Sequence, residues 1–482
     1  MNKFYITSAI PYVNAKPHIG WTTEIIEADT LARYHKILGD RVLFLCGSDE
    51  NALKNLQAAE QAHIPVQSFV DTNAKAFQEL AEVLNIHLDV FQKGSSEKHH
   101  KSSQTLWKLC EKAGDIYKKS YKGLYCVGCE LFYTKGELDE KGECYEHPGK
   151  KLEEVEEENY FFHLSKYQNK LRELLTNGTY QIVPEYRKQE MLSFIDTGLQ
   201  DFSISRSNTR ARNWGVPVPN DPSQRIYVWF DALNIYQSGI GFGWDEKQYN
   251  TWWPADLHVI GKGIIRFHAI YWPAILLSAG LPLPKKLFVH EYLTVNGQKI
   301  SKSLGNAIDP LPLAKQFGTD ALRYYLLAKA SPFSDSDFTV EKLKESYNSD
   351  LANGLGNLVA RVAKLCEQKG FSIKNLRENR PNRILDEITP LIEQFKFNDA
   401  LSHIWGAISG LDSYINKKRP WQQELSEANK TLSNIIIGSE ALTSLLEIAE
   451  ALKPFLPDTA KKIQEQFKGP KITSQKPLFP RI

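Results

Sequence analysis

The first hundred residues alternate between short apolar runs and helical patterns, and this alternation constrains the fold more than any other feature. Residues 4–9 form an apolar run typical of a buried strand. After a loop, the spacing of apolar residues predicts a helix over residues 20–38 that ends at Gly39. A second apolar run, at residues 41–46, is again followed by a turn and a helical pattern. Near-continuous apolar strands joined by helices indicate a parallel, doubly wound α/β sheet.

The pattern changes twice further along the chain. Around Tyr117 it becomes rich in glycine, cysteine and charge, with a mostly charged run at residues 150–158, which predicts an insertion. Strand-like runs return at residues 225–230 and 257–260 and fit a second half of the sheet. From about residue 341 the pattern is helical almost throughout, so the C-terminal third is predicted to be a helix bundle.

The composition excludes several classes of protein. A chain of 482 residues is too long for one compact domain and suits about three. No segment has the roughly eighteen uninterrupted apolar residues of a membrane span, and the N-terminus lacks the layout of a signal peptide. The net charge is only +2, so a nucleic-acid partner would have to be bound by local patches. Six cysteines in so long a chain are not a disulfide framework, and we expect a cytoplasmic protein.

The first chemical motif is Pro-His-Ile-Gly-Trp at residues 17–21, where the loop after the first strand enters the helix. Free N–H groups at a helix N-terminus suit a phosphate, and a histidine there can donate to it. Glycine lets a nucleotide approach the backbone. A turn with a hydrogen-bonded histidine would give the same residues, so the motif alone is weak.

The second motif is Lys-Ile-Ser-Lys-Ser at residues 299–303, preceded by Val-Asn-Gly-Gln. Two lysines on a glycine-flanked segment can close over a polyphosphate and neutralise charge as pyrophosphate leaves. A solvated charged loop would have the same composition. The two motifs in this order, about 280 residues apart, are far more specific together than either is alone.

A third motif has the ligand spacing of a zinc knuckle: Cys126, Cys129, Cys144 and His147. Two CxxC-like pairs suit a closed, tetrahedral, structural zinc and leave no open position for metal catalysis. A chance cluster of reduced cysteines is the alternative. The other three cysteines are predicted to be packing residues: Cys46, Cys110 and Cys366.

The two paired motifs resemble the signatures of class I aminoacyl-tRNA synthetases, and other stretches resemble the methionyl-tRNA synthetases in particular. These stretches are Ser-Ala-Ile-Pro-Tyr-Val-Asn at 8–14, Gly-Ser-Asp-Glu at 47–50, Arg-Asn-Trp-Gly-Val-Pro-Val-Pro at 212–219, Val-Trp-Phe-Asp-Ala-Leu at 228–233 and His-Val-Ile-Gly-Lys at 258–262. The resemblance covers nearly the whole chain. It implies that ATP, with Mg²⁺, activates methionine to methionyl-adenylate, and that the methionyl group then passes to the 3′ end of tRNA(Met).

The resemblance also implies a domain order. A Rossmann-type catalytic sheet would occupy residues 1–112 and 213–290, interrupted at 113–212 by an insertion with the zinc knuckle. Residues 291–345 would form a stem-contact segment with the Lys-Ile-Ser-Lys-Ser loop, and residues 346–482 an all-α anticodon-binding bundle. Nothing after the bundle resembles the appended dimerisation domain of some relatives, so we expect a monomer.

Carried over by residue, the resemblance implies a methionine pocket. Asp49 would hold the ammonium group as a charge-assisted pair. The backbone N–H of Ile10 and the hydroxyl of Tyr236 would approach the thioether sulfur, a weak acceptor. The apolar and aromatic walls would come from Ala9, Tyr12, Trp229, Ala232, Leu233, Ile264 and His268. Seen alone, Trp229 and Tyr12 would be read as ordinary core residues.

The resemblance also implies residues for ATP and for tRNA. The ATP-binding and catalytic residues would be His18, Gly20, Trp21, Lys299 and Lys302, of which the lysines stabilise the leaving pyrophosphate. Asn357 and Arg361 share a helix face, and with Trp421 they match the positions that read the anticodon. An aromatic ring can stack on a base, while an amide and a guanidinium can read its edges. Seen alone, the basic run before Trp421 is a solvated helix end.

Two positions depart from the family pattern. Trp21 stands where the family usually has histidine and sometimes asparagine, and Gly263 stands where aspartate is common. Trp21 motivates one alternative, a catalytically silent paralogue that binds tRNA, but the intact lysines and the complete pocket oppose it. A class I synthetase for another amino acid is the second alternative. The valine, leucine and isoleucine enzymes carry a larger insertion, and a cysteine enzyme would hold zinc in its amino-acid pocket.

Overall fold

The computed structural model describes residues 2–126, 131–133, 136, 138–145, 149, 151–300, 305–373, 382–439 and 443–482. The chain forms two compact units, each built from three separate segments. The first unit comprises Met1–Pro17, Gly39–Ala81 and His87–His290, and the second comprises His18–Leu38, Glu82–Ile86 and Glu291–Ile482. None of the helices in the described ranges combines the length and the apolarity that a membrane crossing needs.

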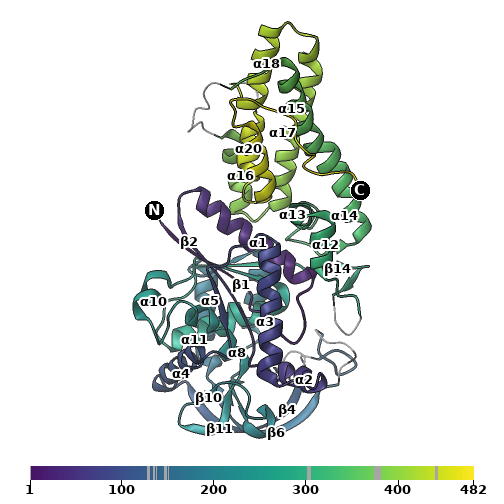
Figure 1. The fold of residues 1–482 in the computed structure, drawn as a ribbon. Coiled ribbons are helices and arrows are strands. Elements are labelled where there is room, and N and C mark those ends of the chain that lie inside the picture. Colours follow the sequence, from purple (N-terminus) through teal and green to yellow (C-terminus); the bar gives the residue numbers. More distant parts are fainter. Residues whose placement is uncertain are drawn as a thin grey trace. The chain divides into compact units, whose positions relative to one another are not determined.

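A six-stranded sheet forms the core of the first unit (Figure 1). Every pair of neighbouring strands is parallel, which confirms the predicted parallel α/β sheet. In spatial order the strands are β3 (Val90–Lys93), β2 (Arg41–Ser48), β1 (Lys3–Ser8), β12 (Leu257–Gly261), β13 (Lys286–His290) and β7 (Gln181–Val183). The runs predicted at residues 4–9, 41–46 and 257–260 are β1, β2 and β12. These runs are apolar because a parallel sheet is buried on both faces.

The strand order of this sheet reverses at β1. From β1 the chain continues to β2 and β3 on one side, and it returns to β12 and β13 on the other. In sheets of this kind, ligands bind beyond the carboxyl ends of the strands at the point of reversal. Tyr12 follows β1 and Asp49 follows β2, and the two residues pair there in an isolated parallel bridge. The topology therefore places these two residues at the carboxyl ends of β1 and β2, next to the reversal between β1 and β12.

One predicted strand is partly wrong. The run at residues 225–230 was expected to continue the parallel sheet, but β11 (Asp221–Ile226) lies in a separate antiparallel sheet with β9 (Ser205–Ser207) and β10 (Pro217–Val218). The residues that follow form a short helix, α8 (Val228–Ala232), all five of them buried. A short apolar run that is buried on every side has no periodicity to separate strand from helix, which is why the sequence misled.

The region predicted as an insertion contains an antiparallel sheet with the strand order β5-β4-β6-β8. Its strands are β4 (Ile116–Cys126), β5 (Leu131–Tyr133), β6 (Glu153–Phe162) and β8 (Phe202–Ser203). Much of the charged run lies in β6, whose first half is largely exposed. β7 also falls within this stretch of sequence, yet it pairs with β13 in the main sheet.

Helices and single helical turns complete the first unit: α2 (Leu53–Gln61), α3 (Val66–Val83), α4 (Glu97–Lys112), η2 (Leu164–Tyr167), α5 (Gln168–Thr176), α6 (Glu185–Asp196), α7 (Asn208–Ala211), α9 (Ile235–Ser238), α10 (Glu246–Trp252), η3 (Lys262–Ile264), the π-helical η4 (Phe267–Tyr271) and α11 (Trp272–Ser278).

The second unit is mainly helical, as predicted from about residue 341 onward (Figure 1). Its helices are α1 (Ile19–Ile37), α12 (Pro310–Phe317), α13 (Thr319–Ala328), α14 (Val340–Ser346), the π-helical η6 (Tyr347–Gly356), α15 (Asn357–Lys369), α16 (Arg383–Glu393), α17 (Phe397–Lys418), η7 (Pro420–Gln422), α18 (Leu425–Ile437), α19 (Leu445–Leu452) and α20 (Pro457–Phe467). A small sheet with the order β15-β14-β16 joins β14 (Leu293–Val295), β15 (Gln298–Lys299) and β16 (Ser336–Phe338).

A buried ion pair ties α1 to the rest of the second unit. The guanidinium of Arg323, on α13, lies 2.7 Å from the carboxylate of Asp29, on α1, and the two side chains are 0% and 2% exposed. The same guanidinium donates to the backbone oxygens of Leu84 and Phe455. Three segments that are distant in sequence therefore meet at one cation.

Candidate active site

His18 caps α1, the helix predicted to receive phosphate. Its Nδ1 atom accepts a hydrogen bond of 3.1 Å from the backbone N–H of Gly20. Burial lowers the pKa of His18, so the ring is held neutral. Because Nδ1 accepts, the single hydrogen of the neutral ring is on Nε2. The capping bond therefore leaves Nε2 as the donor that this helix N-terminus offers to a ligand.

The two signature segments approach each other in the second unit. A Cβ atom on Gly20 would lie 3.1 Å from the His18 ring and 3.5 Å from Cδ1 of Ile300. The His18 ring is the tight neighbour of Gly20, and Ile300, the residue after Lys299, lies within ordinary contact distance of it. Lys299 is exposed, and its ammonium lies 4.8 Å above the ring of Tyr292. Lys302, the other predicted lysine, lies outside the described residues.

Trp21 is 8% exposed in the first turn of α1. The indole is therefore largely buried, and its role at the ATP site stays a prediction. Gly263, the other departure from the family pattern, is exposed within η3.

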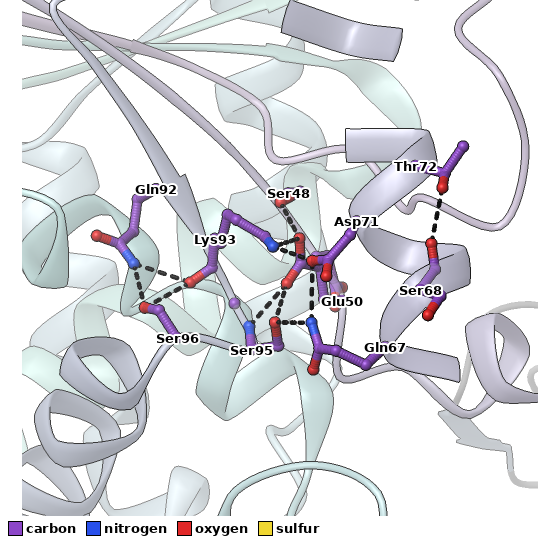
Figure 2. A network of polar contacts seen from close by, with 12 residues as sticks. Ser48, Glu50, Gln67, Ser68, Asp71, Thr72, Gln92, Lys93, Ser95 and Ser96 are labelled. Atoms are coloured by element: carbon purple, nitrogen blue, oxygen red, sulfur yellow. Dashed lines mark hydrogen bonds and ion pairs between the residues drawn. The ribbon is translucent and has the colours of Figure 1, made fainter. Parts of the chain in front are cut away.

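The loop after β2 carries two adjacent carboxylates with separate surroundings. Asp49 is 3% exposed, its backbone N–H donates to the oxygen of Pro11, and its carbonyl accepts from the side chain of Asn55. Figure 2 shows the network around its neighbour Glu50. The Glu50 carboxylate accepts from the hydroxyl of Ser48 at 2.8 Å and from both the backbone N–H and the hydroxyl of Ser95.

The Glu50 network extends to a cation. The ammonium of Lys93 lies 3.9 Å from the Glu50 carboxylate and also pairs with Asp71, as Figure 2 shows. The fully buried Glu50 is thus provided with its own donors. The backbone of the loop is fixed on both sides of Asp49, since Trp214 also donates to the Glu50 carbonyl at 2.8 Å.

Most of the predicted methionine-binding residues belong to the large hydrophobic core cluster of the first unit. The buried members are Ala9, Trp229, Ala232, Leu233 and Tyr236, and the partly buried residues packed against them are Ile10, Tyr12 and Ile264. The rings of Tyr12 and Trp229 are perpendicular, with centroids 6.1 Å apart.

Phe267 belongs to this wall, although it was not among the predicted site residues. Its ring stacks on Trp229 with centroids 3.6 Å apart and planes 5° from parallel. It comes directly before His268 in the π-helical η4. The sequence offered only this adjacency as a signal, because a π-helical turn changes which neighbours share a face.

Tyr236 and His268 form a buried polar pair within this wall. The Tyr236 hydroxyl lies 2.8 Å from Nε2 of His268, and Nδ1 of His268 lies 3.0 Å from the backbone oxygen of Ile264. Burial lowers the pKa of His268 to about 4, so the ring is neutral at physiological pH. The carbonyl of Ile264 can only accept, so Nδ1 carries the hydrogen. Tyr236 must therefore donate its hydroxyl hydrogen to Nε2.

His258 extends the same buried region. Its ring centroid lies 4.4 Å from that of Tyr236, and its Nδ1 atom lies 2.6 Å from the hydroxyl of Thr7. Burial, together with the nearby His268, lowers the pKa of His258 well below its usual value. The wall thus holds two neutral imidazoles and one phenol, a polarizable but uncharged surface.

Two of the four predicted zinc ligands can be placed. Cys126 ends β4, and its sulfur lies 3.2 Å from that of Cys144; both residues are buried. Cys129 and His147 lie outside the described residues. Within the described ranges no three His, Cys, Asp or Glu side chains are grouped to hold a metal ion. The geometry therefore brings two soft donors to one point, which fits half of the predicted ligand set.

The three residues predicted to read the anticodon lie in the second unit. Asn357 is exposed at the start of α15, and Arg361 follows one turn later. The guanidinium of Arg361 lies 5.1 Å from the ring centroid of Trp421 and donates to Asp412 and Asn416. Trp421 is 42% exposed, an unusual state for an indole, and it follows a left-handed residue, Arg419, that ends α17.

Comparisons with known proteins agree with this geometry. The family model described as "tRNA synthetases class I (M)" matches residues 4–363. The chain is 42% identical to the methionine–tRNA ligase of Thermotoga maritima, over 96% of this chain and 74% of that protein. It is 38% identical to that of Brucella melitensis, over 97% and 92% respectively. A solved structure of Mycobacterium tuberculosis methionyl-tRNA synthetase in complex with methionyl-adenylate matches with a TM-score of 0.91 and 34% identity, covering 100% of both chains.

Proposed function

We infer that this chain, which belongs to the methionyl family of class I tRNA synthetases, activates methionine with ATP to methionyl-adenylate and pyrophosphate. It then transfers the methionyl group to the 3′ end of tRNA(Met), and is thus a methionine–tRNA ligase. One observation carries this proposal beyond family membership: Asp49 pairs with Tyr12 at the carboxyl ends of β1 and β2, next to the reversal point of the sheet, and Tyr12 is in contact with Trp229 of the wall.

In this proposal the methionine pocket combines one charge with an uncharged wall. Asp49 holds the ammonium group, and its buried position makes that pair strong. The aromatic rings and neutral imidazoles suit a flexible, polarizable thioether. The hydroxyl of Tyr236 donates its hydrogen to His268, so it has no hydrogen left to donate to the methionine sulfur. The sulfur would contact the hydroxyl oxygen instead. The backbone N–H of Ile10 is then the donor proposed for the sulfur.

The proposed ATP site uses the two signature segments. The Nε2 hydrogen of His18 and the N-terminus of α1 would bind the phosphates, and Gly20 lets the nucleotide approach the backbone. Lys299 and Lys302 would stabilise charge on the departing pyrophosphate, with Trp21 beside them. Mg²⁺ would accompany ATP and neutralise part of the phosphate charge.

The remaining proposals concern zinc, tRNA and the state of the protein. Cys126, Cys129, Cys144 and His147 would hold one structural zinc ion, and the converging sulfurs of Cys126 and Cys144 support this. Stacking on Trp421 and hydrogen bonds from Asn357 and Arg361 would read the anticodon. We further propose that the protein is a monomer in the cytoplasm. We also propose the domain bounds predicted from the sequence: a catalytic sheet at residues 1–112 and 213–290, the insertion at 113–212, the stem-contact segment at 291–345 and the anticodon-binding bundle at 346–482.

The test is amino-acid-dependent exchange of pyrophosphate with ATP across all twenty amino acids. We expect exchange that depends on methionine, followed by methionylation of tRNA(Met). No exchange would favour a silent tRNA-binding paralogue, and strongest exchange with another amino acid would assign a different synthetase.

A further inference from the structure

One carboxylate of the first unit joins the two halves of the candidate methionine pocket. Asp231 is 1% exposed on α8, between Trp229 and Ala232 of the apolar wall. Its Oδ2 atom accepts a 2.6 Å hydrogen bond from the side chain of Asn51. Asn51 lies two residues after Asp49, in the loop that carries the ammonium-binding carboxylate. Asp231 thus links the wall to the loop through a direct hydrogen bond.

The same carboxylate is anchored to a third element. Its Oδ1 atom accepts from Nε2 of His99 at 2.8 Å and from the hydroxyl of Ser103 at 2.7 Å, both on α4. Nδ1 of His99 lies 2.7 Å from the hydroxyl of Ser238, at the end of α9. His99 therefore bridges α8, which carries Trp229 and Ala232 of the wall, and α9, which carries Tyr236.

The network needs an ionised carboxylate at this position. Three donors converge on its two oxygens, and an ion can accept all of them. Burial alone would raise the pKa of Asp231, but His99, Ser103 and Asn51 outweigh burial and lower it. An amide at position 231 would accept at one atom only and would turn its NH₂ group toward a donor. One of the two anchors would then be lost.

We propose that Asp231 is a positioning residue for methionine activation, whose carboxylate fixes the ammonium-binding loop against the apolar wall of the pocket. This inference rests on the proposed function. It follows from the general requirement that a binding constellation be held by a second layer of hydrogen bonds. Asp231 itself touches no substrate in this scheme and acts through Asn51 and through α8.

The test compares Asp231→Asn with Asp115→Asn in pyrophosphate exchange. Asp115 is a matched control, since it is 0% exposed in the same unit and accepts from Lys166 at 2.6 Å and Ser278 at 2.8 Å, neither of which is a proposed pocket residue. Both variants are expected to lower the melting temperature. Only Asp231→Asn should raise the methionine KM, by about tenfold, while the ATP KM stays within about twofold in both.

A second variant keeps the test decisive if Asp231→Asn does not fold. Asn51→Ala removes the hydrogen bond to Asp231, together with one to the backbone oxygen of Gly94, and leaves His99 and Ser103 on the carboxylate. We expect a methionine KM raised about fivefold. Combining the two substitutions should raise the KM by less than the product of the single effects, because both break the same link. An unchanged methionine KM in both single variants, or an equal rise in Asp115→Asn, would overturn the proposal.

The wild-type protein separates this inference from the proposed function. Absence of methionine-dependent exchange in the wild type would defeat the proposed function itself. Methionine-dependent exchange in the wild type, with unchanged KM in the variants, would defeat only the role of Asp231.

Discussion

The hydroxyl of Tyr236 donates to Nε2 of His268 across 2.8 Å, inside a wall where both side chains are at most 1% exposed. Tyr236→Phe removes the donor and leaves a buried imidazole nitrogen without it. Such a loss costs roughly 1–3 kcal/mol. We expect the methionine KM in pyrophosphate exchange to rise about tenfold, with the ATP KM unchanged. Equal changes in both constants would instead indicate a general loosening of the fold.

Burial of His268 makes stability depend on pH. Its pKa in the folded protein is about 4, whereas a histidine in an unfolded chain titrates near 6.5. Between these values the unfolded chain binds more protons, so the free energy of unfolding falls as the pH falls. The stabilisation is complete above about pH 6.5, and roughly 3 kcal/mol of it is lost by about pH 4. Urea unfolding from pH 7 to 4 should show a shallower loss in His268→Gln, and an unchanged slope would contradict the prediction.

Asp49→Ala should remove the partner of the methionine ammonium. We expect kcat/KM for methionine to fall at least 100-fold, about 3 kcal/mol, because a charge pair in a buried position is lost. Asp49→Asn keeps the shape of the side chain but not its charge, so it should recover only a small part of the lost kcat/KM. Steady-state kinetics of pyrophosphate exchange measure both variants. An unchanged kcat/KM in Asp49→Ala would remove Asp49 from the site.

The zinc prediction is about one ion per chain in freshly purified protein, measured by atomic absorption. Cys126→Ala should lower zinc content and weaken aminoacylation more than methionine binding, because the ion holds the insertion together. Cys110→Ala is the matched control: burial raises the pKa of that thiol to about 12, so it stays protonated and binds no metal. Wild-type protein without zinc would refute the ligand set.

Trp421→Ala should raise the tRNA KM sharply and leave pyrophosphate exchange nearly intact. Loss of one base stack costs roughly 1–3 kcal/mol. Trp421→Phe, which keeps a ring beside Arg361, should recover much of the affinity. Parallel losses in exchange and in aminoacylation would mark Trp421 as a folding residue.

Trp21→Phe should lower the rate of methionine activation about tenfold with little change in the methionine KM, as loss of one transition-state donor would. Trp405→Phe offers a matched control, because its indole donates to the backbone oxygen of Asp350 at 3.3 Å within the bundle. Unaltered single-turnover activation in Trp21→Phe would show that the indole only packs within the second unit.

The sequence predicted those features that follow from local pattern. The strands β1, β2 and β12 were visible because buried parallel strands are continuous apolar runs, and α1 because its ends carry clear signals. The assignment of residues 227–230 to a strand failed because buried short runs have no periodicity. Phe267 and Asp231 were missed because their roles depend on partners that are distant in sequence, Trp229 for one and Asn51 for the other. Nothing local in a chain records such pairings.

The ion pair between Arg323 and Asp29 has a consequence for dissecting this protein. A fragment that begins at Glu291 would contain Arg323 but neither Asp29 nor the carbonyl of Leu84, which come from segments near the N-terminus. The fragment would have to bury a guanidinium without its carboxylate, and breaking a buried pair in this way costs roughly 3–5 kcal/mol. No single cut of the chain separates the two units. The helical unit therefore cannot be obtained by one truncation, and a separately expressed version would need both α1 and residues Glu82–Ile86 joined to it.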